Sequence, residues 1–285
     1  MERRSFLQLP AIVPLASAPA APAAFKLSVR VEPMFRKLAL PEQMRKVAEA
    51  GYKGFEFGNW RVENPAEISK LARSLDLECA CIVVRGASEA PMSLTAPADR
   101  AAFLSAVKDS TEAAKRFGTT RMVTLAGKEV PGVPREAQHK SIVEGLKAAH
   151  EIVAPAGITM ILEPFNTLVD HPGAYLAIMQ EAFAIVKEVG SPFLKILFDI
   201  YHVQIMEGNL SNTIRKNIAM IGHFHVADVP GRHEPGTGEI NYLSVFRAIQ
   251  QTGYRDFVGM EYGPSKDPAT TLAEVKALWR TATGQ

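Results

Sequence analysis

The sequence has few of the residues that mark disulfide-rich, zinc-ribbon or nucleic-acid-binding proteins. Its 285 residues include two cysteines, two tryptophans and seven histidines, and the formal net charge is only +2. Cys79 and Cys81 are two apart in a predicted strand, at the upper edge of disulfide distance, and we expect free core thiols. The chain has no CxxC motif. This charge balance predicts neither a nucleic-acid partner nor an anionic membrane surface as a partner.

Long apolar runs are also missing, and the first 24 residues differ in kind from the rest. Their apolar part is interrupted by Pro10, Pro14 and Pro19, so it is too short and broken to span a bilayer. It follows Arg3-Arg4 and ends in small residues, which is typical of a twin-arginine export signal. A plain Ala/Pro-rich tail is the alternative. We expect residues 1–24 to be the signal, and the mature protein to be periplasmic or otherwise exported, without a membrane segment.

From residue 26 onward the chain repeats one unit, a short β-rich run followed by a longer amphipathic segment. Eight such units in about 260 residues are the size and rhythm of a closed (β/α)₈ TIM barrel, here one domain over residues 25–285. A doubly wound open sheet is the alternative, but no strand is followed by a GxGxxG or Walker-type loop. The predicted strands are 26–32, 54–58, 78–84, 121–126, 159–166, 194–202, 221–228 and 257–262. The predicted helices are 41–50, 65–75, 98–117, 135–153, 173–189, 209–218, 242–252 and 268–281.

Ionisable residues gather near the carboxyl ends of these strands, which is where a TIM barrel places its chemistry. Glu163, Asp199, His225 and Glu261 come from four consecutive units and can converge. Three carboxylates and one imidazole suit one divalent ion, with Mn²⁺, Mg²⁺ or Co²⁺ favoured and Zn²⁺ acceptable. The alternative is four separately satisfied core groups. Glu56, at the end of the second strand, is expected to contact substrate or to support a residue that does.

Several long stretches resemble the hydroxypyruvate isomerase family, within the xylose-isomerase-like TIM barrel superfamily. They are LEPFN at 162–166, FDIYHVQ at 198–204, GNL at 208–210, HFHVADVPGRHEPGTGEINY at 223–242 and GMEYGP at 259–264. The resemblance covers essentially everything after the predicted signal and is densest from Glu163 onward.

The resemblance implies a role for each matching residue. The metal-binding catalytic glutamates fall on Glu163 and Glu261, and the metal-binding aspartate falls on Asp199. The fourth metal position falls on His225, where hydroxypyruvate isomerases often have glutamine and ketose 3-epimerases have histidine. This difference leaves the substrate open. The substrate-binding positions fall on His202 and Arg232.

Such a site suits proton transfer at a carbon next to a carbonyl, through an enediolate stabilised by the metal ion. We therefore expect a metal-dependent isomerase of a small sugar or keto-acid substrate, similar to hydroxypyruvate isomerase. A ketose 3-epimerase is the first alternative. A lyase or hydrolase acting on keto-glycosides is the second, and export makes it more credible. The oligomeric state is open, with a homo-oligomer among the options.

Overall fold

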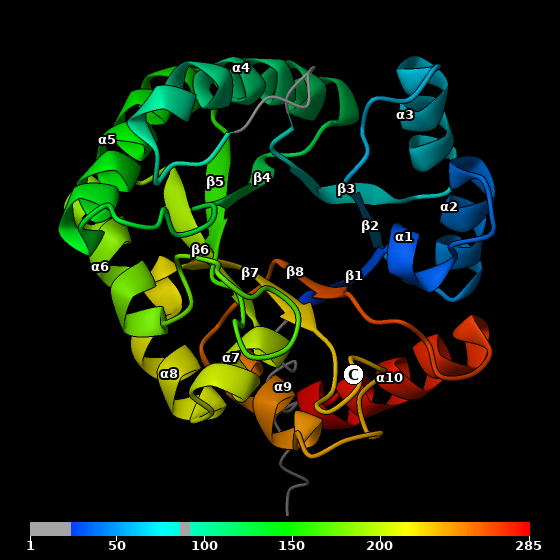
Figure 1. Cartoon of the computed structure of the whole chain (residues 1–285). Coiled ribbons are helices and arrows are strands. Elements are labelled where there is room, and N and C mark those ends of the chain that lie inside the picture. The colour runs from blue at the N-terminus through cyan, green and yellow to red at the C-terminus, as the bar shows by residue number, and fades with distance from the viewer. Residues whose placement is uncertain (1–23, 86–91) are drawn as a thin grey trace, which may run out of the picture.

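The computed structural model describes residues 24–85 and 92–285, and a closed barrel of eight parallel strands forms its centre (Figure 1). The strands follow one another around the barrel in sequence order, and β1 pairs with β8 to close it. This confirms the predicted single-domain (β/α)₈ barrel. The strands are β1 Lys26–Arg30, β2 Gly54–Phe57, β3 Glu78–Val83, β4 Arg121–Leu125, β5 Thr159–Glu163, β6 Leu194–Asp199, β7 Ile221–Val226 and β8 Phe257–Met260.

Helices form a ring around the strands, as Figure 1 shows. They are α1 Val31–Met34, α2 Leu40–Glu49, α3 Pro65–Ser74, α4 Arg100–Phe117, α5 Arg135–Val153, α6 Met179–Val189, α7 Ile200–Met206, α8 Leu210–Asn217, α9 Tyr242–Gln251 and α10 Pro268–Thr283. Several begin with signals that are readable in the sequence. For example, α10 starts at a proline, and the carboxylate of Asp267 accepts a hydrogen bond from Thr270 N at 2.9 Å. Among the described residues, no helix combines the length and the apolar character needed to cross a membrane.

The apolar core has two parts, because the strands are buried on both faces. The larger part lies between the strands and the helices. The smaller part is a cluster of Cys81, Val123, Ile161 and Leu197, from β3, β4, β5 and β6. Cys79 and Cys81 are both buried and unbonded to each other, which confirms the predicted free thiols. The predicted export signal at residues 1–24 lies outside the described residues, apart from its last residue.

The predicted sixth strand was too long, and the error bears on the site. Residues 194–202 form an apolar run that does not distinguish strand from helix by periodicity. In the structure β6 ends at Asp199 and α7 begins at once. The Oδ1 atom of Asp199 caps this helix by accepting from Tyr201 N at 2.8 Å and His202 N at 3.2 Å. One carboxylate oxygen is therefore committed to the backbone, while Oδ2 remains for other partners.

The predicted helix at 173–189 was also too long, since α6 begins only at Met179. Residues before it run alongside the segment that follows β4, where Ala174 bridges to Lys128 and Tyr175 N donates to the carbonyl of Gly127 at 3.0 Å. This extended segment forms part of the wall beside Glu163.

Candidate metal centre

The ends of four consecutive strands carry the side chains that the sequence indicated as metal ligands. Glu163 ends β5, Asp199 ends β6, and Glu261 directly follows β8. His225 lies in β7, where it is the register partner of Asp199 on one side and of Gly259 on the other. Each of the four predicted ligands offers an atom, and these atoms all lie within 4.8 Å of one another. Parallel strand pairing thus brings all four side chains together.

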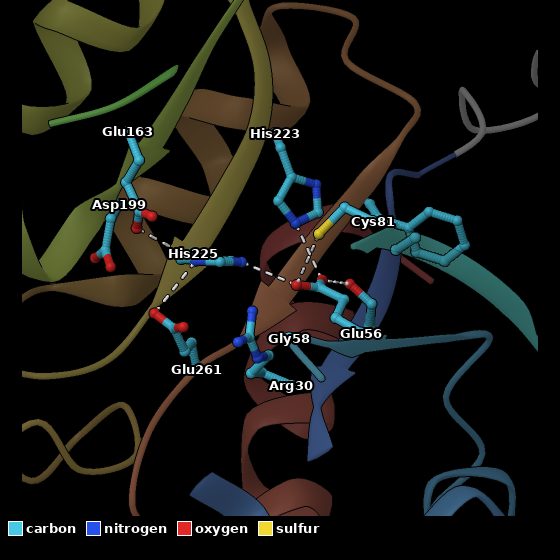
Figure 2. A network of polar contacts seen from close by, with 12 residues as sticks. Arg30, Glu56, Gly58, Cys81, Glu163, Asp199, His223, His225 and Glu261 are labelled. Carbon is cyan, nitrogen blue, oxygen red and sulfur yellow. Dashed lines mark hydrogen bonds and ion pairs between the residues drawn. The ribbon is translucent and has the colours of Figure 1, made fainter. Parts of the chain in front are cut away.

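His225 presents its two ring nitrogens to different surroundings. Nδ1 lies 3.3 Å from Oε2 of Glu261 and 3.8 Å from Oε1 of Glu163, and it is buried without a hydrogen-bond partner. Nε2 lies 2.9 Å from Oε2 of Glu56, on the opposite side of the ring (Figure 2). An ionised carboxylate can only accept, so Nε2 carries a proton. Nδ1 is therefore the nitrogen left to bind a cation.

The carboxylates around His225 strongly favour a positive charge at this position. Burial disfavours a charged imidazole, but Glu261 and Glu56 outweigh burial and raise the pKa of His225 well above its ordinary value. Burial raises the pKa of Glu163. Burial also acts on Glu261, but there His225 and Arg232 prevail and lower the pKa. A site that draws a proton onto a buried imidazole can hold a divalent cation in place of that proton.

His202 directs an unpaired nitrogen toward the same place. Its Nδ1 lies 2.6 Å from Nδ2 of Asn166, and the amide oxygen of Asn166 already accepts from the backbone N–H groups of Val169 and Asp170. The amide nitrogen must therefore donate to Nδ1, which leaves the proton of a neutral His202 on Nε2. Nε2 is buried, lies 3.5 Å from Oδ2 of Asp199 and has no hydrogen-bond partner. Sequence reasoning missed Asn166, although it closes the LEPFN stretch.

Arg232, from the loop after β7, lies on the Glu261 side of the ligand cluster, which consists of the four predicted ligands Glu163, Asp199, His225 and Glu261. Its Nη2 donates to Oε2 of Glu261 at 2.8 Å and lies 3.7 Å from Oδ2 of Asp199. The guanidinium carbon lies 5.1 Å from the ring centroid of Tyr201. The φ angle of Arg232 is 55°, a left-handed conformation that is uncommon for a residue with a side chain. The loop therefore holds this side chain against the predicted ligands.

Glu56 lies deeper in the barrel than a substrate contact requires. Its side chain is fully buried, and both oxygens are occupied. Oε1 accepts from Ser28 Oγ at 2.5 Å and from His223 Nε2 at 3.0 Å. Oε2 accepts from His225 Nε2 at 2.9 Å and from Cys81 Sγ at 3.3 Å. His225 lies between Glu56 and the other three predicted ligands, Glu163, Asp199 and Glu261 (Figure 2). The geometry therefore does not bring Glu56 to a substrate at those ligands, and it favours a supporting role.

The loop after β7 is rigidly braced by its own ionisable residues. The carboxylate of Asp228 accepts from backbone N–H groups of the loop, including Gly236 N at 2.8 Å. Nδ1 of His233 lies 2.6 Å from the carbonyl of Gly263, and Glu234 accepts from both the N–H and the hydroxyl of Ser265. These contacts account for Asp228, His233 and Glu234 as structural supports of the loop.

Two cavities flank the cluster. One, of about 330 Å³, lies beside Glu163 and includes Phe165, whose ring stacks on His171 with centroids 3.9 Å apart. The other, of about 370 Å³, lies beside Glu261 and is lined by Arg30, Glu32, Pro33, Arg36, Gly231, Arg232, His233 and Gly263. A small molecule bound at the cluster therefore has room on both sides.

Comparison with known proteins identifies the family to which this barrel belongs. Residues 44–282 match the family model described as xylose isomerase-like TIM barrel. The chain belongs to this family. The chain is 34% identical over 266 residues to a putative hydroxypyruvate isomerase of Mus musculus, covering 90% of this chain and 96% of the relative. Hydroxypyruvate isomerase of Escherichia coli is 32% identical over 258 residues, covering 89% and 97%.

One further curated relative and two solved structures extend the comparison. A 2-oxo-tetronate isomerase of Cupriavidus necator is 36% identical over 180 residues, covering 63% of this chain and 69% of the relative. The solved structure of an AP endonuclease, family 2, from Brucella melitensis matches with a TM-score of 0.82 at 28% identity, covering 90% and 98%. The structure of an L-ribulose 3-epimerase matches with a TM-score of 0.78 at 18% identity, covering 90% and 95%, which shows a shared fold.

Proposed function

We propose that this protein is a divalent-metal-dependent isomerase of a small hydroxy-carbonyl substrate, similar to hydroxypyruvate isomerase. The observation that carries the proposal is the buried Nδ1 of His225, which has no partner and faces three carboxylates at the ends of neighbouring strands. The relatives support the reaction type, since hydroxypyruvate isomerase and 2-oxo-tetronate isomerase both interconvert small keto compounds.

The donor set fits a divalent ion. Glu163, Asp199, His225 and Glu261 would hold it, and three carboxylates with one imidazole favour Mn²⁺, Mg²⁺ or Co²⁺ and tolerate Zn²⁺. When bound, such an ion polarises a substrate carbonyl and stabilises the negative charge that develops next to it.

The protein's own groups would move the proton and hold the substrate. Glu163 and Glu261 come from β5 and from the end of β8, on either side of His225, so each can reach a carbon held between them. One carboxylate removes the proton next to the carbonyl, and the other or the same one returns it. His202, through its Nε2 proton, and Arg232, through its guanidinium, would donate hydrogen bonds to substrate oxygens.

Epimerisation at the same site is the second candidate. Return of the proton to the neighbouring carbon isomerises an aldose–ketose pair, whereas its return to the same carbon from the other face gives an epimer. The histidine at position 225 favours this candidate, because the sequence resemblance matches the histidine of ketose 3-epimerases to that position. Cleavage of a keto-glycoside would start with the same proton removal and then expel a leaving group.

The test begins with metal analysis of the purified protein. Solvent deuterium exchange and product formation are then followed by NMR with hydroxypyruvate, ketoses and keto-glycosides, each with Mn²⁺, Mg²⁺ or Co²⁺. We expect Glu261→Gln to reduce exchange by at least 100-fold, on the scale of a lost general base. The control is Glu78→Gln, at the opposite end of the barrel strands, which removes the same charge. Full exchange activity in Glu261→Gln would exclude the acid–base role.

A further inference from the structure

Arg30, the last residue of β1, is held by only one edge of its guanidinium. Its Nε donates to Oε2 of Glu32 at 2.8 Å. Glu32 is itself fixed, because Oε1 accepts from the backbone N–H groups of Gly58 and Asn59. Within residues 24–85 and 92–285, the two Nη atoms of Arg30 make no hydrogen bond. Glu32 thus orients the guanidinium through Nε, and the edge formed by the two Nη atoms remains available for another partner.

The position of Arg30 is built into the backbone around it. A Cβ atom on Gly58 would lie 2.4 Å from Nη2 of Arg30, so a side chain at position 58 would displace the guanidinium from where it lies. The Arg30 side chain is 16% exposed, and Figure 2 shows it beside Glu261 and Glu56. Nearby carboxylates, Glu261 above all, outweigh burial and raise the pKa of Arg30, so the guanidinium stays charged. A largely buried cation with unused hydrogen-bond donors is suited to bind an anion.

The cavity next to Arg30 opens onto the ligand cluster. Glu261 belongs to both, and the same cavity, of about 370 Å³, is lined by Arg36 and Arg232. Two of the acidic groups are already engaged, Glu32 by Arg30 and Glu261 by Arg232. A substrate with its carbonyl at the cluster would therefore place a neighbouring substituent against unfilled N–H donors.

We propose that the Nη edge of Arg30 binds the carboxylate of the substrate, so that the enzyme prefers 2-oxo acids to neutral ketoses. The planar guanidinium offers two parallel N–H groups, which match the two oxygens of a carboxylate. This inference rests on the proposed isomerase function, and it names the substrate class for that site. The alternative is that Arg30 only balances the charge of Glu261 and Glu56, in which case acids and neutral ketoses would respond alike to its removal.

The test compares hydroxypyruvate with dihydroxyacetone, in which a CH₂OH group replaces the carboxylate. Deuterium exchange into both is measured for the wild type, Arg30→Met and Arg30→Lys, after metal loading and verification of metal content. We expect Arg30→Met to lower kcat/KM for hydroxypyruvate by about 10- to 100-fold, as for a lost hydrogen bond between charged groups, with less than about a 3-fold change for dihydroxyacetone. Arg30→Lys keeps the charge without the fork and should fall between.

The matched control is Lys26→Met, which removes a positive charge from the other end of the same strand. It should leave the ratio between the two substrates unchanged. A second measurement does not depend on turnover. Binding of pyruvate, which lacks the hydroxyl group needed for isomerisation, is followed by calorimetry against neutral hydroxyacetone, with metal-loaded and EDTA-treated protein. Arg30→Met should weaken pyruvate binding by a similar factor and leave hydroxyacetone unaffected.

The outcomes separate this inference from the proposed function. Equal losses for the acid and the neutral substrate, or unchanged pyruvate binding in Arg30→Met, would overturn the carboxylate subsite and leave isomerisation standing. If the wild type exchanges neither substrate but still binds pyruvate through Arg30, the proposed isomerase activity on three-carbon substrates fails and the subsite stands.

Discussion

The supporting role of Glu56 can be tested by the substitution Glu56→Gln, which preserves shape and removes the charge. In the wild type, Glu56 accepts from Nε2 of His225 at 2.9 Å and from Nε2 of His223 at 3.0 Å. A glutamine has one oxygen and one NH₂ group, so it can accept from only one of the two imidazoles. An NH₂ group facing His225 would require an unprotonated Nε2 and would move the neutral proton to Nδ1. That proton would occupy the nitrogen that faces the carboxylates.

The expected magnitude follows from this displacement of the proton. Loss of a carboxylate that orients a metal-binding histidine typically weakens metal affinity by about 10- to 100-fold, or about 1.4–2.7 kcal/mol. Glu56 is fully buried, so solvent cannot replace its contact with His225. We therefore expect Glu56→Gln to lie toward the upper end of this range, although none of its atoms would touch the ion.

The assay is competition between the protein and a chelator of known affinity for Mn²⁺ or Co²⁺. The Co²⁺ absorption spectrum reports separately whether the coordination has changed. Ser28→Ala is the matched control, because it removes the 2.5 Å hydrogen bond to the same carboxylate without touching His225. It should change the affinity by less than about 3-fold. Circular dichroism and thermal unfolding of the metal-free variants would separate a local effect from misfolding.

The role of Glu56 in orienting His225 would be refuted if Glu56→Gln bound Mn²⁺ as tightly as the wild type and gave the same Co²⁺ spectrum. It would also be refuted if Ser28→Ala weakened binding as much as Glu56→Gln. That result would make the network a general structural element and not a device that orients His225.

Two further predictions concern the same framework. A Cβ atom on Gly259 would lie 2.3 Å from Oε1 of Glu56 and 3.0 Å from Cδ2 of His225. Gly259→Ala should therefore lower the free energy of unfolding by about 1–3 kcal/mol and weaken metal binding. Thermal unfolding of this variant at the wild-type temperature would contradict the prediction. For Glu234, burial raises the pKa but hydrogen bonds from Ser265 outweigh it, so the folded pKa is lowered. Its stabilisation is present above the unfolded pKa of about 4.3 and is lost as the pH falls through the folded value. In urea unfolding at pH 7 and pH 3.5, Glu234→Gln should therefore lose less stability on acidification than the wild type, and an identical pH dependence would argue against this contribution.

The fold could be predicted because a parallel barrel repeats one pattern, and each repeat has its own start and stop signals. The helix at 135–153 was predicted with the bounds observed for α5. Boundaries failed where a polar side chain decides them in three dimensions. Asp199 ends β6 because its carboxylate caps α7, and the surrounding apolar run gives no indication of that. The start of α6 moved for a different reason, since the backbone before Met179 pairs with residues that follow β4.

Convergence of the four predicted ligands could be predicted because the carboxyl ends of parallel strands meet by construction. What the sequence could not supply is depth within the barrel. Glu56 and His225 are 169 residues apart, and their contact depends on which faces of β2 and β7 turn inward. Arg30 was missed for a different reason: a lone arginine at a strand end resembles a solvated side chain until Glu32 and Gly58 are seen to hold it.

Burial of Glu56 is itself an argument for its role. Within the described residues, no lysine or arginine donates a hydrogen bond to this carboxylate, and a buried charge without compensation is strongly destabilising. The imidazoles of His223 and His225 compensate the charge of Glu56 instead. Burial and the charge of His225 lower the pKa of His223 and so disfavour its protonation. Cys81, which donates to Glu56, also belongs to an apolar cluster with Val123, Ile161 and Leu197. Retention of a carboxylate behind His225 is explained if the protein needs that imidazole held with Nδ1 toward the carboxylates, and the metal affinity of Glu56→Gln measures that need directly.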